Sequence, residues 1–429
     1  MAQVMGRRAA GMLLGAMGTA ALAAPRAQAR QVPEFWHYLG APGEIEAVKA
    51  LMAVANAKYP NTPITDRVIP GSSAGVRQQV QVSLMGGVPP TSFQLSAGYE
   101  LRSTAATGRL VEVADVWKDV RGDEIFSEGL RRVLSLSGSA YGIPFGVGII
   151  SNVFYNKAVF ERLKLSVPTS WDEFGEVCKA LKAADIHPLT SAQGPSWTTY
   201  QFYGPLITVL GVEGCWEFIR GNVAFNGPEM LRAFRLFKER MASNFDPTWT
   251  GAKWSDGVDQ MMRGRVGMYC VGDWASAYMK QRGWTPGKEY DLFYLPGLEK
   301  VSITQTDVAV VLKGEMTETG KNFLRAIATP EAQEAFAKIK GGTAPNSKTS
   351  PDIYDVLARR TFEKLGRTGD GYVTIPNPYL MLPTGFHIEF GTEVERFAAK
   401  LDEQALVASL NTLEQKRQQL KREDKFASF

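Results

Sequence analysis

The alternation of strand-like and helix-like segments in residues 33–108 places the strongest constraint on the fold of this chain. The segments PEFWHYL, PITDRVI and TSFQL are typical of short strands, and GEIEAVKALMAVANAKY, VRQQVQVSLM and YELRSTAATG are typical of helices. Such alternation predicts an α/β fold in which helices cover both faces of a parallel sheet. Ligands of these sheets bind beyond the carboxyl ends of the strands. We therefore expect the loops after Tyr38, Pro70 and Leu95 to share one edge.

The rest of the chain indicates a second lobe. Residues 170–263 have a mostly helical pattern, short strands return in VGMYCVG, DLFYLP and DVAVVLKG, and the C-terminal part is again helical. A chain of 429 residues also exceeds the roughly 250–300 residues that one hydrophobic core usually supports. Because no low-complexity linker separates the halves, we expect the two lobes to exchange strands.

The N-terminus has the pattern of a bacterial export signal over residues 1–29. A basic Arg7-Arg8 pair precedes an apolar run from about Ala9 to Ala24, and Ala27-Gln28-Ala29 fits a cleavage site. The run is shorter than the roughly 20 residues of a membrane span. The paired arginines favour the twin-arginine route to the periplasm, whereas the small residues after Arg8 leave the ordinary secretory route open.

Charge and cysteine content restrict the classes of partner. Removal of residues 1–29 would lower the basic residues from 48 to 45 against 44 acidic ones, so the exported chain is nearly neutral. A near-neutral chain lacks the charge that nucleic acids or anionic membranes attract, so neither is expected as a partner. The three cysteines could form one disulfide or remain as buried thiols; they are Cys178, Cys215 and Cys270.

The segment Gly71-Ser72-Ser73-Ala74-Gly75 matches the G-x-S-x-G motif of serine hydrolases. A hydrolase also needs an acid and a histidine that can accept the proton of Ser73. His37 precedes Ser73, His187 falls in the helical region, and His387 follows without an HGGG-like oxyanion loop upstream. We therefore favour a glycine-rich turn whose backbone amides approach a ligand. The sequence has no metal-binding or nucleotide-binding motif either, so neither a metal nor a cofactor is expected.

Three stretches resemble one family, the extracellular solute-binding proteins that deliver sugars to bacterial ABC importers. They are YGIPFGVGIISNVFYNKAVFERLKLSVPTSWDEF, VAFNGPEMLRAFRLFKE and MMRGRVGMYCVGDWA. The resemblance implies a type II (Venus-flytrap) fold of two α/β lobes, each a mostly parallel sheet flanked by helices, with hinge crossings near residues 141–146 and before Asp307. It places one lobe in residues 30–143 plus 305–346 and the other in residues 144–304 plus 347–429.

A sugar exposes apolar C–H faces and a ring of hydroxyl groups, so its site needs aromatic rings together with charged or amide side chains. The loop after the first strand offers Trp36, His37 and Tyr38, followed by Glu44. The alternative for Trp36 is packing in the core, and the alternative for His37 is a buried position without ligand contact. A second group, from Asp273-Trp274 and SWTTYQFY, contributes the ligand candidates Asp273, Trp274, Trp197 and Tyr200.

The resemblance adds three polar residues. Asp307 aligns with a hydroxyl-binding aspartate, and Lys340 with the lysine of the family's Lys-Gly-Ser-Ile-Pro segment. Ser96 stands near the position where the glucose binders of the family have a lysine, and His37 replaces their second tryptophan. The resemblance therefore implies a carbohydrate other than glucose.

Together these patterns predict a periplasmic binding component of an ABC transporter, and not an enzyme. It would capture a mono- or oligosaccharide between its lobes and deliver it to an inner-membrane permease, with a chemoreceptor as a further partner. Two alternatives stay open at this point. One is the same fold with a polyol, glycerol phosphate or other small polar solute, and the other is an exported hydrolase that uses Ser73.

Overall fold

A computed structural model describes residues 32–136, 138–367 and 369–426 of the chain. The predicted export signal of residues 1–29 lies outside this part. Within the described residues, no helix combines the length and the hydropathy that a membrane span requires.

The first three strands form a parallel sheet, as the sequence predicts. They are β1 (Glu34–His37), β2 (Thr65–Val68) and β3 (Ser92–Ser96), and β1 pairs in parallel with both of the others. The strand order is β11-β10-β3-β1-β2, and β6 joins the other side of β10. β1 thus lies between β3 and β2, and both of its edges are paired.

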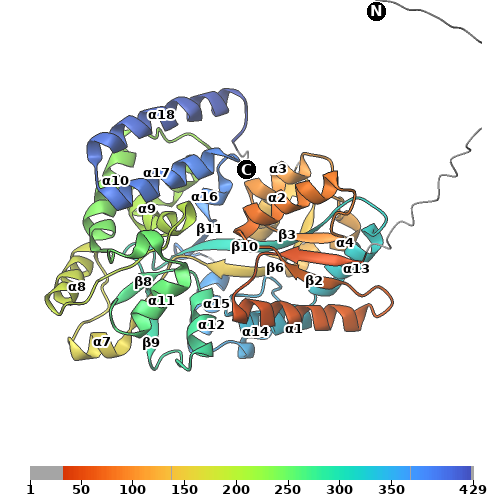
Figure 1. Ribbon diagram of the computed structural model, residues 1–429, viewed down its shortest axis with the longest axis horizontal. Helices are drawn as coiled ribbons and strands as arrows, with labels where there is room; N and C mark the ends of the chain where they lie inside the picture. The colour runs from red at the N-terminus through yellow and green to blue at the C-terminus, as the bar shows by residue number, and fades with distance from the viewer. Residues whose placement is uncertain (1–31, 137, 368, 427–429) are drawn as a thin grey trace, which may run out of the picture. The chain divides into compact units, whose positions relative to one another are not determined.

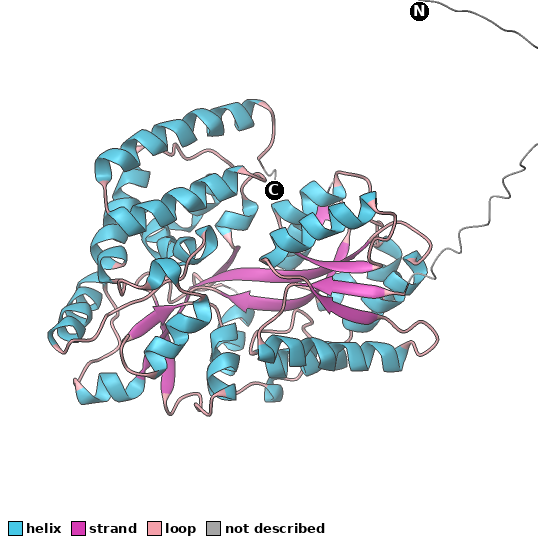
Figure 2. Cartoon of the chain, in the orientation of Figure 1, coloured by secondary structure: helices cyan, strands magenta, loops and turns pink. Residues whose placement is uncertain are grey.

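Helices cover the two faces of this sheet (Figures 1 and 2). Buried side chains of α1 (Pro42–Lys58), α13 (Thr317–Ile327) and α14 (Pro330–Lys340) form one core with Phe35 of β1. Those of α2 (Ser72–Met85) and α3 (Tyr99–Ala105) belong to a core that includes Trp36, on the opposite side of the same strand. Phe35 and Trp36 enter different cores because successive side chains of a strand point to opposite faces of the sheet.

Two long strands carry the chain between the lobes. The strands β6 (Gly142–Ile149) and β10 (Val301–Val311) pair antiparallel over almost their whole length. The first half of β10 pairs with β11 (Val373–Pro376), and its second half pairs with β3. The expected hinge crossings fall on these two strands, while the lobe boundaries at 143 and 305 stay a prediction. Gly142 is required at the crossing, because a Cβ there would lie 2.5 Å from Val308 and 2.7 Å from the Ala309 carbonyl oxygen.

The sheet of the second lobe differs from the expected parallel arrangement. It consists of β7 (Asn152–Asn156) between β8 (Met268–Cys270) and β9 (Tyr290–Tyr294), and both pairings are antiparallel. The reason is the direction of the chain at the hinge. β7 leads away from the crossing strand β6, whereas β8 and β9 both run back toward the crossing.

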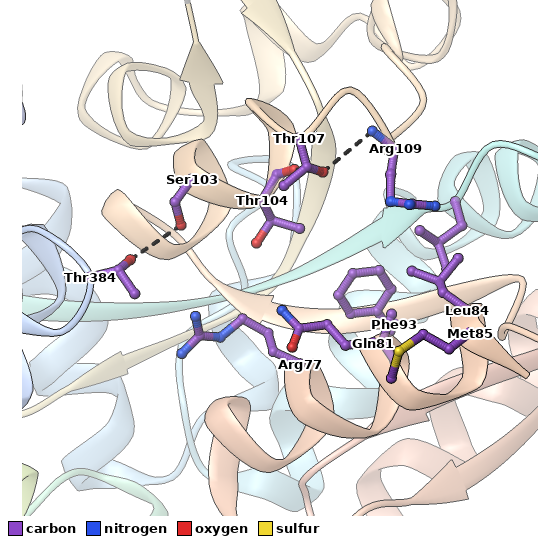
Figure 3. A pocket seen from close by; sticks show the side chains of 12 residues that line it. Arg77, Gln81, Leu84, Met85, Phe93, Ser103, Thr104, Thr107, Arg109 and Thr384 are labelled. Atoms are coloured by element: carbon purple, nitrogen blue, oxygen red, sulfur yellow. Dashed lines mark hydrogen bonds between the residues drawn. The ribbon is translucent and has the colours of Figure 1, made fainter.

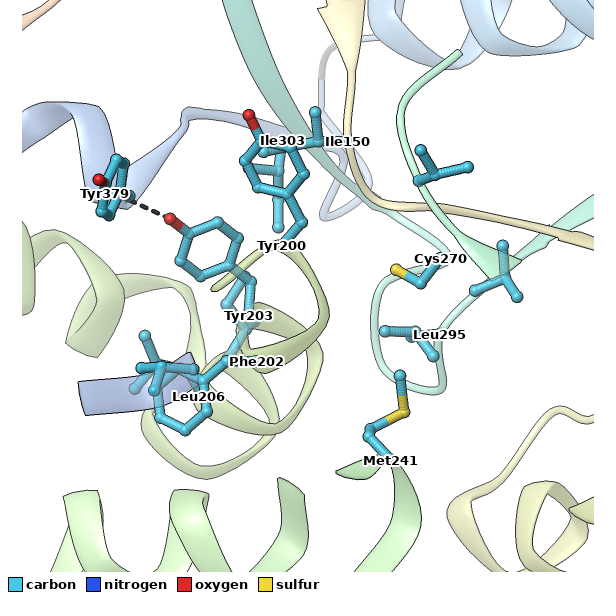
Figure 4. Packing of buried hydrophobic residues seen from close by; sticks show 14 of the residues in the cluster. Ile150, Tyr200, Phe202, Tyr203, Leu206, Met241, Cys270, Leu295, Ile303 and Tyr379 are labelled. Atoms are coloured by element: carbon cyan, nitrogen blue, oxygen red, sulfur yellow. Dashed lines mark hydrogen bonds between the residues drawn. The ribbon is translucent and has the colours of Figure 1, made fainter. Parts of the chain in front are cut away.

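A helical layer supports this small sheet. The kinked helix α9 (Pro195–Ile219) packs against α10 (Pro228–Arg240), α16 (Pro378–Met381) and α17 (Phe386–Lys400). Figure 4 shows part of this core, in which the backbone N–H of Tyr379 donates to the hydroxyl of Tyr203 at 2.8 Å. The expected helical C-terminus is present as α17 and α18 (Glu403–Arg422).

The other elements connect these layers. The helices are α4 (Ala114–Asp119), α5 (Gly122–Ile125), α6 (Glu128–Leu134), α7 (Lys157–Arg162), α8 (Trp171–Ala183), α11 (Trp254–Met262), α12 (Trp274–Gln281) and α15 (Val356–Gly366). A short hairpin pairs β4 (Ser135–Leu136) with β5 (Ser139–Ala140), and single 3₁₀ turns cover Ala242–Asn244, Trp249–Gly251 and Pro351–Ile353.

Of the two alternatives for the cysteines, the structure has three buried free thiols, Cys178, Cys215 and Cys270. Burial raises the pKa of each thiol to about 12. The thiols therefore stay protonated and act as small apolar groups in the core.

Candidate ligand-binding cleft

A cavity of about 240 Å³ lies where the hinge strands meet both lobes. It is lined by seven of the residues predicted from the sequence, namely Tyr38, Glu44, Trp197, Tyr200, Trp274, Asp307 and Lys340. Tyr38 follows β1, Asp307 lies on β10, and Trp274 begins α12 directly after β8. Tyr38 lies beyond the carboxyl end of β1, as the parallel-sheet rule predicts. Asp307 comes instead from the middle of the hinge strand, and Trp274 follows a strand of the antiparallel second-lobe sheet.

Aromatic rings form the second-lobe wall of this cavity. Trp274, Trp197 and Tyr200 form a mutual cluster. The Trp274 ring centroid lies 6.2 Å from that of Trp197 and 6.3 Å from that of Tyr200, both at steep interplanar angles, and the latter two rings are 5.6 Å apart. Trp254 lies 6.4 Å from Trp197 and also lines the cavity. The Trp274 ring rests on Gly272, where a Cβ would come within 2.1 Å of the indole. Glycine at 272 is therefore required for the tryptophan to face the cavity.

A buried ion pair forms the polar wall. Asp307 accepts hydrogen bonds from the Tyr38 hydroxyl at 2.8 Å, the Gln94 amide at 2.8 Å and the Lys340 ammonium at 3.1 Å. Asp307 and Lys340 are only 4% and 5% exposed. Charges this buried persist only when they are paired and hydrogen-bonded, so the two groups hold each other in position.

The charges around Lys340 determine its protonation. Burial opposes its positive charge, but Asp307, Asp273 and Glu44 together raise the pKa of Lys340 above its ordinary value. Burial raises the pKa of Glu44, an effect that Lys340 partly offsets. Burial also raises the pKa of the Tyr38 phenol, and the charge of Asp307 adds to that rise. The site therefore offers an ammonium donor, a phenol and carboxylate acceptors.

Asp273 was predicted to bind ligand, and the structure places it at the hinge. Its Oδ2 accepts from the Ile149 N–H at 3.0 Å, and its own N–H donates to the Ile149 carbonyl at 3.1 Å. It lines a separate narrow space beside Ser276 and Thr343 and does not line the 240 Å³ cavity. These bonds connect the end of β8 to the end of β6.

Burial raises the pKa of Asp273 to about 7, and this predicts a pH-dependent stability. Between about pH 4 and 7 the folded protein retains a proton that the unfolded chain releases, so this residue makes the free energy of unfolding fall as the pH rises. The Asp273→Asn variant lacks this contribution, so the slope of its free energy of unfolding against pH should be more positive over that range. Urea unfolding at pH 4.5, 6 and 7.5 tests this, with the exposed Asp172→Asn as control. An unchanged slope in Asp273→Asn would contradict the assignment.

Trp36 and His37 do not line the cleft. Trp36 is 3% exposed, packs in the core beneath α2 and α3, and donates its indole N–H to Glu34 at 2.8 Å. His37 is fully buried on the opposite face, where it stacks on Phe35 with centroids 5.6 Å apart and lies 3.3 Å from Asp66. Their placement agrees with the core-packing interpretation, because helices cover both faces of β1. Tyr38 is the first residue of this stretch to reach the cavity.

A second cavity of about 270 Å³ adjoins the first. The two share Tyr38, Ser72, Ser196, Tyr200 and Gln305. Ser96 lines this second space, and its backbone N–H donates to Glu100 at 2.7 Å. Glu100 is also paired with Arg77 at 2.7 Å. The charges of Arg77 and Glu100 therefore offset each other in the wall of the second cavity.

Several cleft residues were not predicted from the sequence. Gln305 accepts a hydrogen bond from the Tyr200 hydroxyl at 2.7 Å, and it shares a strand face with Asp307 two residues on. That alternation could have identified Gln305. Trp254, Tyr379 and the Arg77–Glu100 pair reach the cleft through tertiary packing, for which the sequence offers no local pattern.

The structure also locates the G-x-S-x-G segment. Ser73 lies in the first turn of α2, after Gly71 with a φ of 95°, and a Cβ on Gly75 would lie 2.1 Å from the Pro70 carbonyl oxygen. Ser73 and His387 line the same cavity, but among the described residues Ser73 has no hydrogen bond to a histidine. Burial lowers the pKa of His387 to about 4, so it is a poor proton acceptor. The segment therefore acts as a tight turn that opens a helix at the cleft.

Within the described part of the chain, no group of three or more His, Cys, Asp or Glu side chains is arranged to hold a metal ion.

Comparison with known proteins identifies the family. The family described as bacterial extracellular solute-binding protein matches residues 41–334, and the chain belongs to this family. A probable sugar-binding periplasmic protein of Brucella suis is 24% identical over 362 residues, which cover 81% of this chain and 84% of the relative. An uncharacterized ABC transporter extracellular-binding protein of Pyrococcus horikoshii is 27% identical over 358 residues, covering 82% and 80%.

Solved structures show the same fold. The bacterial solute receptor AcbH, described as having an exclusive preference for b-D-galactopyranose, superposes with a TM-score of 0.80. The match covers 91% of this chain and 99% of the receptor at 20% sequence identity. The chain thus has the two-lobed type II fold of periplasmic binding proteins, which confirms the predicted fold class.

Proposed function

We propose that this protein is the extracellular carbohydrate-binding component of an ABC importer. The observation that carries the proposal is the pairing of an aromatic wall with a buried ionic wall across one cavity. Trp274, Trp197 and Trp254 face Asp307 and Lys340 there. The sugar-binding names of relatives such as the Brucella suis protein support the choice of ligand.

The two walls match the two kinds of surface on a sugar ring. Indole faces cover the apolar C–H groups, while Lys340, Glu44 and Gln305 exchange hydrogen bonds with hydroxyls. The indole N–H groups of Trp197, Trp254 and Trp274 have no acceptor among the described residues, so they can donate to ligand oxygens. We expect the stacking on Trp274 and the hydrogen bonds to Lys340 to contribute most of the affinity.

The hinge supplies the mechanism of capture. Trp274 belongs to the second lobe and Lys340 to the first, and the Lys340 nitrogen lies 6.0 Å from the Trp274 ring. A ligand between them bridges the lobes and so favours the closed arrangement over the open one by its difference in affinity. The closed protein would then be recognised by a permease in the membrane. Capture and release require no change of covalent bonds, in keeping with a family of binding proteins.

The charges of the cleft favour a neutral sugar over glycerol phosphate. Among the described residues that line the two cavities, the permanent cations are Lys340 and Arg77, and each is already paired with a carboxylate. A phosphate would need cations free of such partners. Glu44 and Asp307 would instead repel it.

Export to the outside of the cell membrane accords with the family. The twin-arginine route stays a prediction, because residues 1–31 lie outside the described part of the chain, and a chemoreceptor partner stays one as well.

A ligand panel tests the proposal. Mono- and disaccharides, glycerol, sorbitol and glycerol 3-phosphate are added to the mature protein, and the thermal midpoint is measured. A sugar at about 100 times its Kd should stabilise the protein by about 2.7 kcal/mol. Glycerol 3-phosphate should leave the midpoint unchanged. Stabilisation by the phosphate ester alone would overturn the choice of a neutral carbohydrate.

A further inference from the structure

Three cavities follow one another along the cleft. The tryptophan-lined cavity and the second cavity share five wall residues, including Tyr38 and Gln305. The second cavity in turn shares Arg77 and Thr384 with a third space of about 600 Å³. We call this third space the α2–α3 groove, because those two helices supply most of its wall.

The α2–α3 groove runs away from the hinge toward the far ends of both helices (Figure 3). Near the second cavity it begins at Arg77 and at Ser103, whose hydroxyl lies 3.3 Å from that of Thr384. At its other end lie Met85, which is 82% exposed, and Arg109. The groove thus continues the cleft over the surface of the first lobe.

The walls of the groove mix apolar and hydrogen-bonding groups. Val80, Leu84 and Met85 provide apolar surface, and Gln81, Thr104 and Thr107 provide amide and hydroxyl groups. No carboxylate lines it in the described part of the chain. Such alternation suits a ligand that is apolar on its ring faces and polar at its rim, which is the chemistry of a carbohydrate chain. The Thr104 and Thr107 hydroxyls already donate to the backbone carbonyls of Glu100 and Thr104, so they are available to a ligand as acceptors, while the Gln81 amide can both donate and accept.

We propose that the ligand is a linear oligosaccharide of three or more units that runs through all three cavities. This inference rests on the proposed function. One unit lies against Trp274, the next lies beside the Arg77–Glu100 pair, and the following units extend along the α2–α3 groove. The first two cavities, about 240 and 270 Å³, are each smaller than the roughly 300–1,000 Å³ of sites that enclose a drug-sized ligand, so each suits one small ring.

A chain-length series tests the proposal. Binding is measured by calorimetry for glucose, xylose and N-acetylglucosamine and for their β-1,4-linked and α-1,4-linked oligomers of two, three and four units. In the series that binds, the Kd should fall from one unit to three, by about tenfold overall or more. A Kd that is equal for one and three units overturns the proposal while leaving the proposed function intact. Absence of binding by every sugar instead overturns the proposed function itself.

Two matched variants on α2 test where the oligosaccharide lies. Gln81 and Gln79 are both exposed, but only Gln81 lines the groove, since residues two apart on a helix point in nearly opposite directions. Gln81→Trp should block the groove and raise the Kd for the trimer and tetramer about tenfold, without changing the Kd of the monomer. Gln79→Trp should leave every Kd unchanged. Equal effects of the two variants, or an unchanged Kd of the trimer for Gln81→Trp, would contradict an oligosaccharide that follows this groove.

Discussion

Replacing Trp274 by alanine should lower the affinity for the bound sugar by about 30-fold or more. A buried aromatic at the centre of a contact typically contributes at least about 2 kcal/mol, which corresponds to this factor. Trp274 is 9% exposed and its ring packs against both Trp197 and Tyr200, so its removal also exposes both neighbours to the cavity. Calorimetric titration of the folded variant measures the change.

The control for this variant separates binding from stability. Trp249 is 5% exposed and packs in the same core, but it lines none of the three cavities of the cleft. Both alanine variants should lose about 3–5 kcal/mol of unfolding free energy. Only the variant at Trp274 should lose sugar affinity, and Trp274→Phe should recover part of it. Equal loss of affinity in Trp249→Ala would show that the effect is global and would contradict a direct contact.

Replacing Lys340 by methionine should destabilise the protein by about 3–5 kcal/mol, the usual cost of leaving a buried charge without its partner. Asp307 would keep only the neutral donors Tyr38 and Gln94. Sugar affinity should also fall, by about 30-fold or more, because an ammonium donor to the ligand is lost. Urea unfolding and calorimetry measure the two effects separately.

A double variant separates the contribution of the ion pair to stability from its contribution to sugar binding. Lys340→Met combined with Asp307→Asn removes both charges and should recover more than half of the lost stability. It should not recover sugar binding, because the ammonium donor of Lys340 is still absent. A Lys340→Met protein as stable as the original would contradict the buried pair. Recovery of sugar binding by the double variant would contradict its role in the cleft.

The sequence predicts those parts of the site that depend on local order along a strand. The edge rule for parallel sheets places Tyr38, which follows β1, at the cleft. Trp274 and Asp307 were found because each is adjacent to or part of an apolar strand, but the hinge brings them to Tyr38. Trp36 was wrongly grouped with Tyr38 as a ligand candidate in the same loop, because the pattern alone does not show where the strand leaves the sheet. The burial of Trp36 and His37 depends on the helices that pack on the two faces of β1, which come from distant parts of the chain.

Other parts of the site depend on packing between distant segments. Trp254 and Tyr379 reach the cleft through helices whose contacts are long-range. The Arg77–Glu100 pair joins α2 and α3, which come together only when the strands before them pair into the sheet. The antiparallel pairing in the second lobe likewise follows from the direction of the hinge strands, which the alternation of residue types in β7, β8 and β9 does not encode.

The most direct test of the account is a crystal structure of the mature protein with the tightest-binding sugar from the panel. We expect one sugar ring stacked on the indole of Trp274, with hydroxyls within hydrogen-bonding distance of Lys340 and Glu44. Electron density for the sugar outside the space between Trp274 and Lys340, with that space filled by solvent, would contradict the account.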